Sequence, residues 1–167
     1  TASPFVYIQM FELSETTYGL LFAANIAGLM AFGYASARLV DRKGTARLAA
    51  FGAWAALGGA TLVVMGAWNA GTGWINLMLI ASGLLVAVGA LGLVAPNTVA
   101  QLLGAHPNNA GAASALYGFA QFGLGGVASL AVSLTEDGSA KPMAALVFGF
   151  LLVAALMAQG NFRTGVI

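Results

Sequence analysis

Charged residues are confined to a few short segments of this chain, and the stretches between them are long and apolar. Five of the eleven Asp, Glu, Lys and Arg residues fall within residues 38–47. On either side lie roughly twenty residues without any charge, enough for a helix to cross the ~30 Å hydrocarbon core of a bilayer. Only 7% of the residues are charged, against about 25% in a soluble domain. The pattern therefore predicts an integral membrane protein.

The uncharged runs predict an all-α membrane protein with five transmembrane helices plus a truncated sixth. The runs are too long for buried strands, and they lack the alternation that a membrane β-barrel requires. The predicted spans cover approximately residues 18–40, 48–68, 74–103, 110–134 and 142–159. The third span contains Pro96 and is expected to continue past it.

Polar segments are expected to separate these spans. Ser14 is a candidate N-cap for the first span, and the apolar residues 1–11 are interpreted as the end of a helix that begins further upstream. A turn is predicted at residues 69–73, and loops are predicted at 104–109 and at 135–141, the second with its turn at 136–138.

The distribution of Lys and Arg predicts the orientation of the chain, because cytoplasmic loops are enriched in both. One side would carry Arg38, Arg42, Lys43, Arg47 and Arg163. The other side would carry Lys141 together with the carboxylates Glu12, Glu15, Glu136 and Asp137. The loop at 38–47 and the C-terminus are therefore predicted to be cytoplasmic in a multi-pass protein.

Small residues recur at four-residue steps along three of the spans. The stripes are Ala23, Ala27, Ala31 and Ala35, then Gly52, Ala56 and Ala60, then Gly111 and Ala115. Small side chains allow helix backbones to approach closely in lipid, so these stripes predict tight helix packing.

A few polar and aromatic side chains within the spans are candidates for a substrate cavity. They are Phe22, Asn25, Asn97, Tyr117 and Gln121. Phe22 and Asn25 share a predicted face with Tyr18, Leu29, Phe32 and Ser36. An amide in hydrocarbon is costly unless it pairs or meets water. Aromatic rings with sparse hydrogen-bonding groups suit a drug-like molecule, whereas interhelical hydrogen bonding for packing is the alternative.

Several other kinds of function have little support in the sequence. There is no cysteine, and His106 is the single histidine, expected at the surface beside Pro107, so no metal site or cofactor is predicted. All five carboxylates lie in predicted loops or at helix ends, and no nucleophile motif is present, so we do not expect an enzyme. The net charge of +1 gives no reason to expect nucleic-acid binding.

The segment from Ala37 to Arg47 resembles the signature loop of the major facilitator superfamily, G-x-L-a-D-r-x-G-r-k. The match rests on Leu39, Asp41, Arg42 and Gly44, with Arg47 near the trailing basic position. Ala37 replaces the leading glycine, and Thr45-Ala46 replace the first basic pair, which is typical of the weaker copy in the C-terminal half. The resemblance implies a gating role for Asp41, Arg42, Gly44 and Arg47. The alternative is a loop whose cations only fix the topology.

Further segments resemble one branch of that superfamily, the Bcr/CflA drug-resistance efflux transporters, in the same order along the chain. They are residues 3–7, 95–100, 109–122 and 137–143. The resemblance implies that residues 1–167 form the C-terminal half of a twelve-helix major facilitator fold, from the end of helix seven through helix twelve.

The same resemblance implies a secondary active transporter in the inner membrane. It would export drug-like molecules, such as bicyclomycin and chloramphenicol in that branch, by proton antiport with alternating access, and so confer antibiotic resistance. Its partners would be the drug, protons, the lipid bilayer and the missing N-terminal six-helix half, which would hold the proton-coupling residue. The alternative is a non-transporting helical module for membrane packing or assembly.

Overall fold

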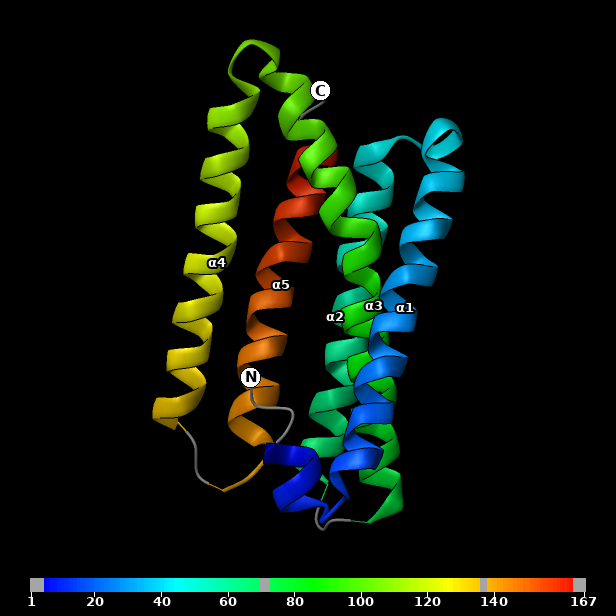
Figure 1. Ribbon diagram of the computed structural model, residues 1–167, viewed down its shortest axis with the longest axis vertical. Coiled ribbons are helices and arrows are strands. Elements are labelled where there is room, and N and C mark those ends of the chain that lie inside the picture. Colours follow the sequence, from blue (N-terminus) through cyan, green and yellow to red (C-terminus); the bar gives the residue numbers. More distant parts are fainter. Residues whose placement is uncertain (1–4, 70–72, 136–137, 164–167) are drawn as a thin grey trace.

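In the computed structural model, the described residues form five long helices that run alternately up and down (Figure 1). The structure describes residues 5–69, 73–135 and 138–163. The elements are η1 (Phe5–Met10), α1 (Glu15–Lys43), α2 (Thr45–Trp68), α3 (Trp74–Ala105), η2 (Pro107–Asn109), α4 (Ala110–Thr135) and α5 (Lys141–Arg163). Residues 1–4, 70–72, 136–137 and 164–167, which include parts of the predicted turns and tail, lie outside the described residues.

All five long helices are long and apolar enough to cross a membrane, which confirms the predicted spans. Each predicted boundary lies within a few residues of the observed one, because the uncharged runs define where a helix can sit in hydrocarbon. Ser14 is the N-cap of α1, and its hydroxyl accepts a hydrogen bond from the Thr17 backbone N–H at 3.2 Å. As predicted, α3 continues through Pro96.

The predicted loop at residues 38–47 is wrong in its extent. Helix α1 continues to Lys43 and α2 begins at Thr45, so only Gly44 is not helical. At about 1.5 Å per residue, α1 exceeds the thickness of the hydrocarbon core. The charged residues of this segment therefore belong to the ends of α1 and α2, on either side of Gly44.

The most extensive helix pair in the bundle is α2 with α3, and glycine backbones bring the two helices close together. A Cβ atom added to Gly59 would lie 2.6 Å from the Gly83 carbonyl oxygen, and one added to Gly83 would lie 2.6 Å from the Gly59 oxygen. Gly52 and Gly66 make similar close approaches seven residues away on either side. The buried stripe of Gly52, Ala56 and Ala60 is thus a packing surface, as predicted. A seven-residue spacing is the repeat of left-handed helix pairs.

The opposite face of α3 packs against α1. A Cβ atom on Gly92 would overlap the Leu29 carbonyl oxygen and lie 2.7 Å from the Gly33 backbone nitrogen, and one on Gly89 would lie 3.2 Å from the Phe32 ring. Helix α3 is therefore held between α1 and α2, while α5 packs against α2 around Ala155.

Two of the predicted packing stripes are largely uncovered within the described chain. Ala23, Ala27 and Ala31 are exposed on α1 and Ala35 is half-buried, because α1 turns its other face, with Phe32 and Ser36, towards α3. Gly111 and Ala115 are also exposed, and a Cβ atom on Gly111 would meet nothing within 4 Å.

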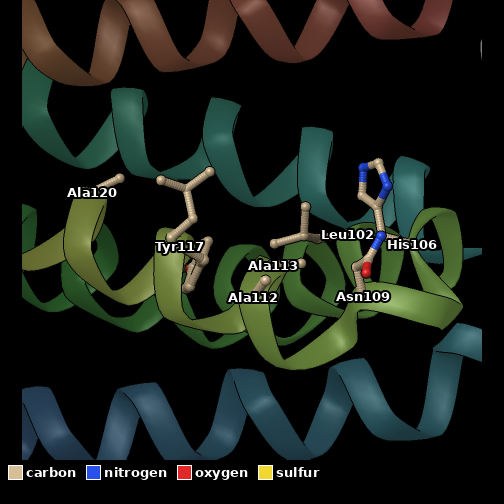
Figure 2. A pocket seen from close by; sticks show the side chains of 8 residues that line it. Leu102, His106, Asn109, Ala112, Ala113, Tyr117 and Ala120 are labelled. Carbon is tan, nitrogen blue, oxygen red and sulfur yellow. The ribbon is translucent and has the colours of Figure 1, made fainter.

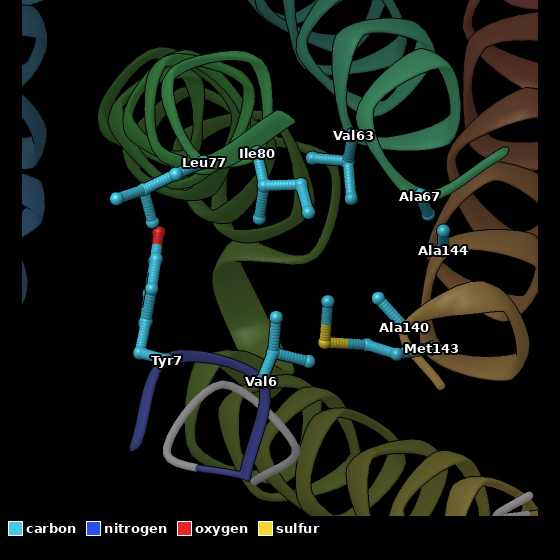
Figure 3. Close-up of a cluster of buried hydrophobic side chains, with 9 residues drawn as sticks. All are labelled: Val6, Tyr7, Val63, Ala67, Leu77, Ile80, Ala140, Met143 and Ala144. Carbon is cyan, nitrogen blue, oxygen red and sulfur yellow. The ribbon is translucent and has the colours of Figure 1, made fainter. Parts of the chain in front are cut away.

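At the lower end of the bundle lies η1, six residues within the segment that the sequence analysis interpreted as the end of a helix. Val6 and Tyr7 are 1% exposed and pack among apolar side chains of α2, α3 and α5 (Figure 3). The Tyr7 hydroxyl has no hydrogen-bond partner among the described residues.

Helix α4 stands at one edge of the bundle and contributes no buried residue (Figure 1). It contacts α3 and α5 only sparsely. An apolar cavity of about 390 Å³ lies between these three helices. Helix α4 is therefore packed much more loosely than α1, α2 and α3 are packed against one another.

We predict that Gly59→Ala destabilises the protein by about 1–3 kcal/mol, because the new methyl group would overlap the α3 backbone. Unfolding of the purified protein, followed by circular dichroism in detergent, measures this change. Gly58→Ala is the matched control, because a Cβ atom there meets nothing within 4 Å. Equal effects of the two substitutions would contradict the glycine-mediated contact.

Candidate functional site

Gly44 makes the sharp reversal between α1 and α2 possible. Its backbone has φ 77° and ψ 153°, a region that essentially only glycine adopts. The Gly44 N–H donates to the Val40 carbonyl at 2.8 Å, and the Gly44 carbonyl accepts from the Leu48 N–H at 3.3 Å. Gly44 is therefore the residue whose backbone conformation allows α2 to reverse direction after α1.

The charged gating candidates surround this reversal at the upper end of the bundle (Figure 1). Asp41, Arg42 and Arg47 are all exposed, and none forms an ion pair with another described side chain. Arg38 behaves differently. It donates a hydrogen bond to the Tyr34 hydroxyl, and its guanidinium carbon lies 4.8 Å from the centroid of that ring. Asp41, Arg42 and Arg47 therefore remain available to a partner.

Asn97, a cavity candidate, is buried between α1 and α3 and is 3% exposed. Its amide nitrogen donates to the Ser36 hydroxyl at 2.6 Å and to the Leu93 carbonyl at 2.7 Å. Ser36 is equally buried. This geometry is the interhelical hydrogen bonding that the sequence left open as the alternative to substrate contact.

Two of the cavity candidates, Phe22 and Asn25, belong to α1. Phe22 is 52% exposed, and its ring centroid lies 6.3 Å from that of Tyr18. The Tyr18 ring lies 6.1 Å from Tyr7, so this aromatic row begins at the lower end of the bundle. Asn25 is half-buried one turn above Phe22.

Tyr117 lines a pocket of about 430 Å³ near the upper end, which we name the corner pocket (Figure 2). It lies where α3 ends, η2 turns and α4 begins. Its lining residues are Leu102, His106, Asn109, Ala112, Ala113, Leu116, Tyr117 and Ala120. The size is within the range of small-molecule sites, and most of the lining is apolar.

The corner pocket contains only one of the five cavity candidates. Phe22, Asn25, Asn97 and Gln121 do not line it, and Gln121 is exposed on α4. The five candidates do not meet around this pocket.

The sequence missed the contributions of Leu102, His106 and Asn109. His106 is exposed, as predicted, but it also lines the corner pocket. Pro107 is the sequence feature that could have indicated this arrangement, because it begins the short η2 turn that joins the end of α3 to the start of α4.

No group of three or more potential metal ligands occurs among the described residues. Comparison of the chain with protein-family models, curated proteins and solved structures finds no match. The family resemblance therefore rests on the quoted residues alone.

We predict that Ser36→Ala and Asn97→Ala each destabilise the protein, and that the two effects are not additive. Membrane interhelical hydrogen bonds couple by about 0.6–1.7 kcal/mol. A double-mutant cycle on detergent unfolding measures the coupling. Ser82→Ala serves as the control, because its hydroxyl bonds at 2.6 Å to the Met78 carbonyl within α3. Strict additivity of the Ser36 and Asn97 effects would show that the hydrogen bond contributes no stability.

Proposed function

We propose that this chain is the C-terminal half of a secondary active transporter of the major facilitator superfamily. It would export drug-like small molecules across the inner membrane by proton antiport. The observation that carries the proposal is the Leu39-Asp41-Arg42-Gly44 segment. Its glycine adopts a backbone conformation that other residues avoid, and its Asp41 and Arg42 side chains are unpaired in the described chain.

The geometry at this reversal suits a gating element. Two helices meet at one non-helical residue, so a change at Gly44 alone would alter the angle between α1 and α2. The exposed Asp41 and Arg42 could then pair with, or release, helices of a second half as the halves rock. In the predicted orientation this end faces the cytoplasm.

Uncovered small-residue surfaces support a missing partner half. The α1 stripe contains Ala23, Ala27 and Ala31, and α4 carries Gly118, Gly125 and Gly126 with nothing within 4 Å of an added Cβ atom. Lipid tails do not require small residues, whereas close helix packing does. We infer that another set of helices covers these faces.

The same uncovered surfaces favour a second candidate function, a packing or assembly module that moves no substrate. The two proposals differ over the sequence that precedes this chain. Six further spans with a stronger copy of the signature loop are expected for the transporter.

We predict that cells carrying the gene with its upstream sequence export a panel of unrelated antibiotics, and that Asp41→Asn slows this export roughly tenfold or more. A coupling of about 1–3 kcal/mol between a gate and the transport step corresponds to such a factor. Efflux driven by a proton gradient, with and without an uncoupler, measures the rate.

Glu15→Gln is the matched control, since Glu15 is an exposed carboxylate at the opposite end of the same helix. If Asp41→Asn leaves export unchanged, the charged residues around Gly44 would fix only the topology of the chain and would have no gating role. Failure to export any compound would favour the assembly module.

A further inference from the structure

Pro96 divides α3 into two parts that are held very differently. Ten residues of α3 are buried, and all of them lie between Asn76 and Asn97. None of residues 98–105, which we name the upper α3 segment, is buried. The part of α3 below Pro96 is therefore fixed by its packing, whereas the upper α3 segment lacks buried anchors of its own.

The helix is also weakened at Pro96 itself. Proline has no backbone N–H, so the helical hydrogen bond from residue 96 to the Gly92 carbonyl cannot form. Gly92 lies where α1 approaches α3 closely, because a Cβ atom there would lie 2.7 Å from the Gly33 backbone nitrogen. Sharp bends in helices occur characteristically at proline. The weak point of α3 therefore lies directly above the point where α1 holds it.

One interhelical hydrogen bond joins α1 to α3 just above this weak point. The Asn97 amide nitrogen donates to the Ser36 hydroxyl at 2.6 Å. Further up, the Gln101 amide nitrogen donates to the Asn97 carbonyl at 3.0 Å, which is a bond within α3. In the described chain, no side chain of the upper α3 segment is hydrogen-bonded to another helix. The Ser36–Asn97 bond is thus the uppermost polar link between α3 and α1.

The upper α3 segment has open space on two sides. The corner pocket lies towards α4, and Leu102 contributes to its lining (Figure 2). A second cavity of about 180 Å³ lies between α2, α3 and α5, and Thr98 and Gln101 line it. Close-packed protein interiors resist movement because they contain few voids larger than a water molecule. A segment between two cavities can instead change position without displacing packed side chains.

We propose that the upper α3 segment is a hinged element that swings about Pro96, with the Ser36–Asn97 hydrogen bond as its latch. Helix α3 lies between α1 and α2, so a segment that leaves Ser36 moves towards the cavity beside Thr98 and Gln101. Hinges of this kind need only a few residues that absorb the change in backbone angles. The inference does not depend on transport, because it concerns a movement of the chain itself.

The absence of cysteine in the sequence allows spin labels to be attached at chosen pairs of positions. Ala31→Cys on α1 with Ala105→Cys reports on the upper α3 segment. Ala31→Cys with Ser82→Cys is the matched pair for α3 below Pro96, and all three positions are exposed. Double electron–electron resonance of the purified protein in lipid nanodiscs measures the distribution of distances for each pair.

We expect two populations of distance for the Ala31–Ala105 pair and one for the Ala31–Ser82 pair. Ser36→Ala removes the acceptor of the latch. It should raise the ratio of the swung to the latched population about 3- to 20-fold, the factor that corresponds to an interhelical hydrogen bond in a membrane. Pro96→Ala supplies the missing backbone N–H and should leave a single population.

Thr61→Ala is the control for loss of a hydroxyl, because the Thr61 hydroxyl donates at 2.9 Å to the Leu57 carbonyl within α2. It should leave both distance distributions unchanged. A single Ala31–Ala105 population both before and after Ser36→Ala would overturn the proposal. A broad distribution that Pro96→Ala leaves unchanged would also overturn it, since simple fraying of the helix end gives that result.

Discussion

The backbone contact between Gly59 and Gly83 is the interaction on which the rest of the bundle depends. It brings α2 and α3 so close that their main chains touch, which no larger residue would permit. In lipid, such packing replaces the hydrophobic drive that assembles soluble helices. With α3 fixed on α2, the other side of α3 receives α1 at Gly92, and α5 closes against α2.

Helix α4 shows what happens where that kind of contact is missing. It has no buried residue, although it is as glycine-rich as α2 and α3. Its glycines meet nothing, so the gap to α3 contains cavities of about 390 and 430 Å³ in place of packed backbone. The corner pocket consequently has one firmly packed side, formed by α3, and one loosely packed side, formed by α4.

The membrane spans could be predicted from the sequence because length and lack of charge are local properties. The sequence could not predict which helix packs against each face, because periodicity shows which residues share a face but not what lies opposite them. Asn97 and Ser36 come from distant parts of the chain, and only the fold shows that they bond to each other. His106 was expected merely at the surface, because its place in the corner pocket depends on how η2 turns. The segment around Gly44 was expected to be a loop, and the helices proved to extend through its charges.

Hydrogen–deuterium exchange of the purified protein in lipid nanodiscs tests this organisation most directly, because exchange reports local stability along the chain. We predict that residues 83–93 of α3, which face both α1 and α2, exchange most slowly of all the helical segments. Residues 110–135 of α4 should exchange fastest among the five long helices. Uniform exchange across the helices, or slowest exchange in α4, would contradict the claim that the α2–α3 contact organises the protein and that α4 is the weakly held wall.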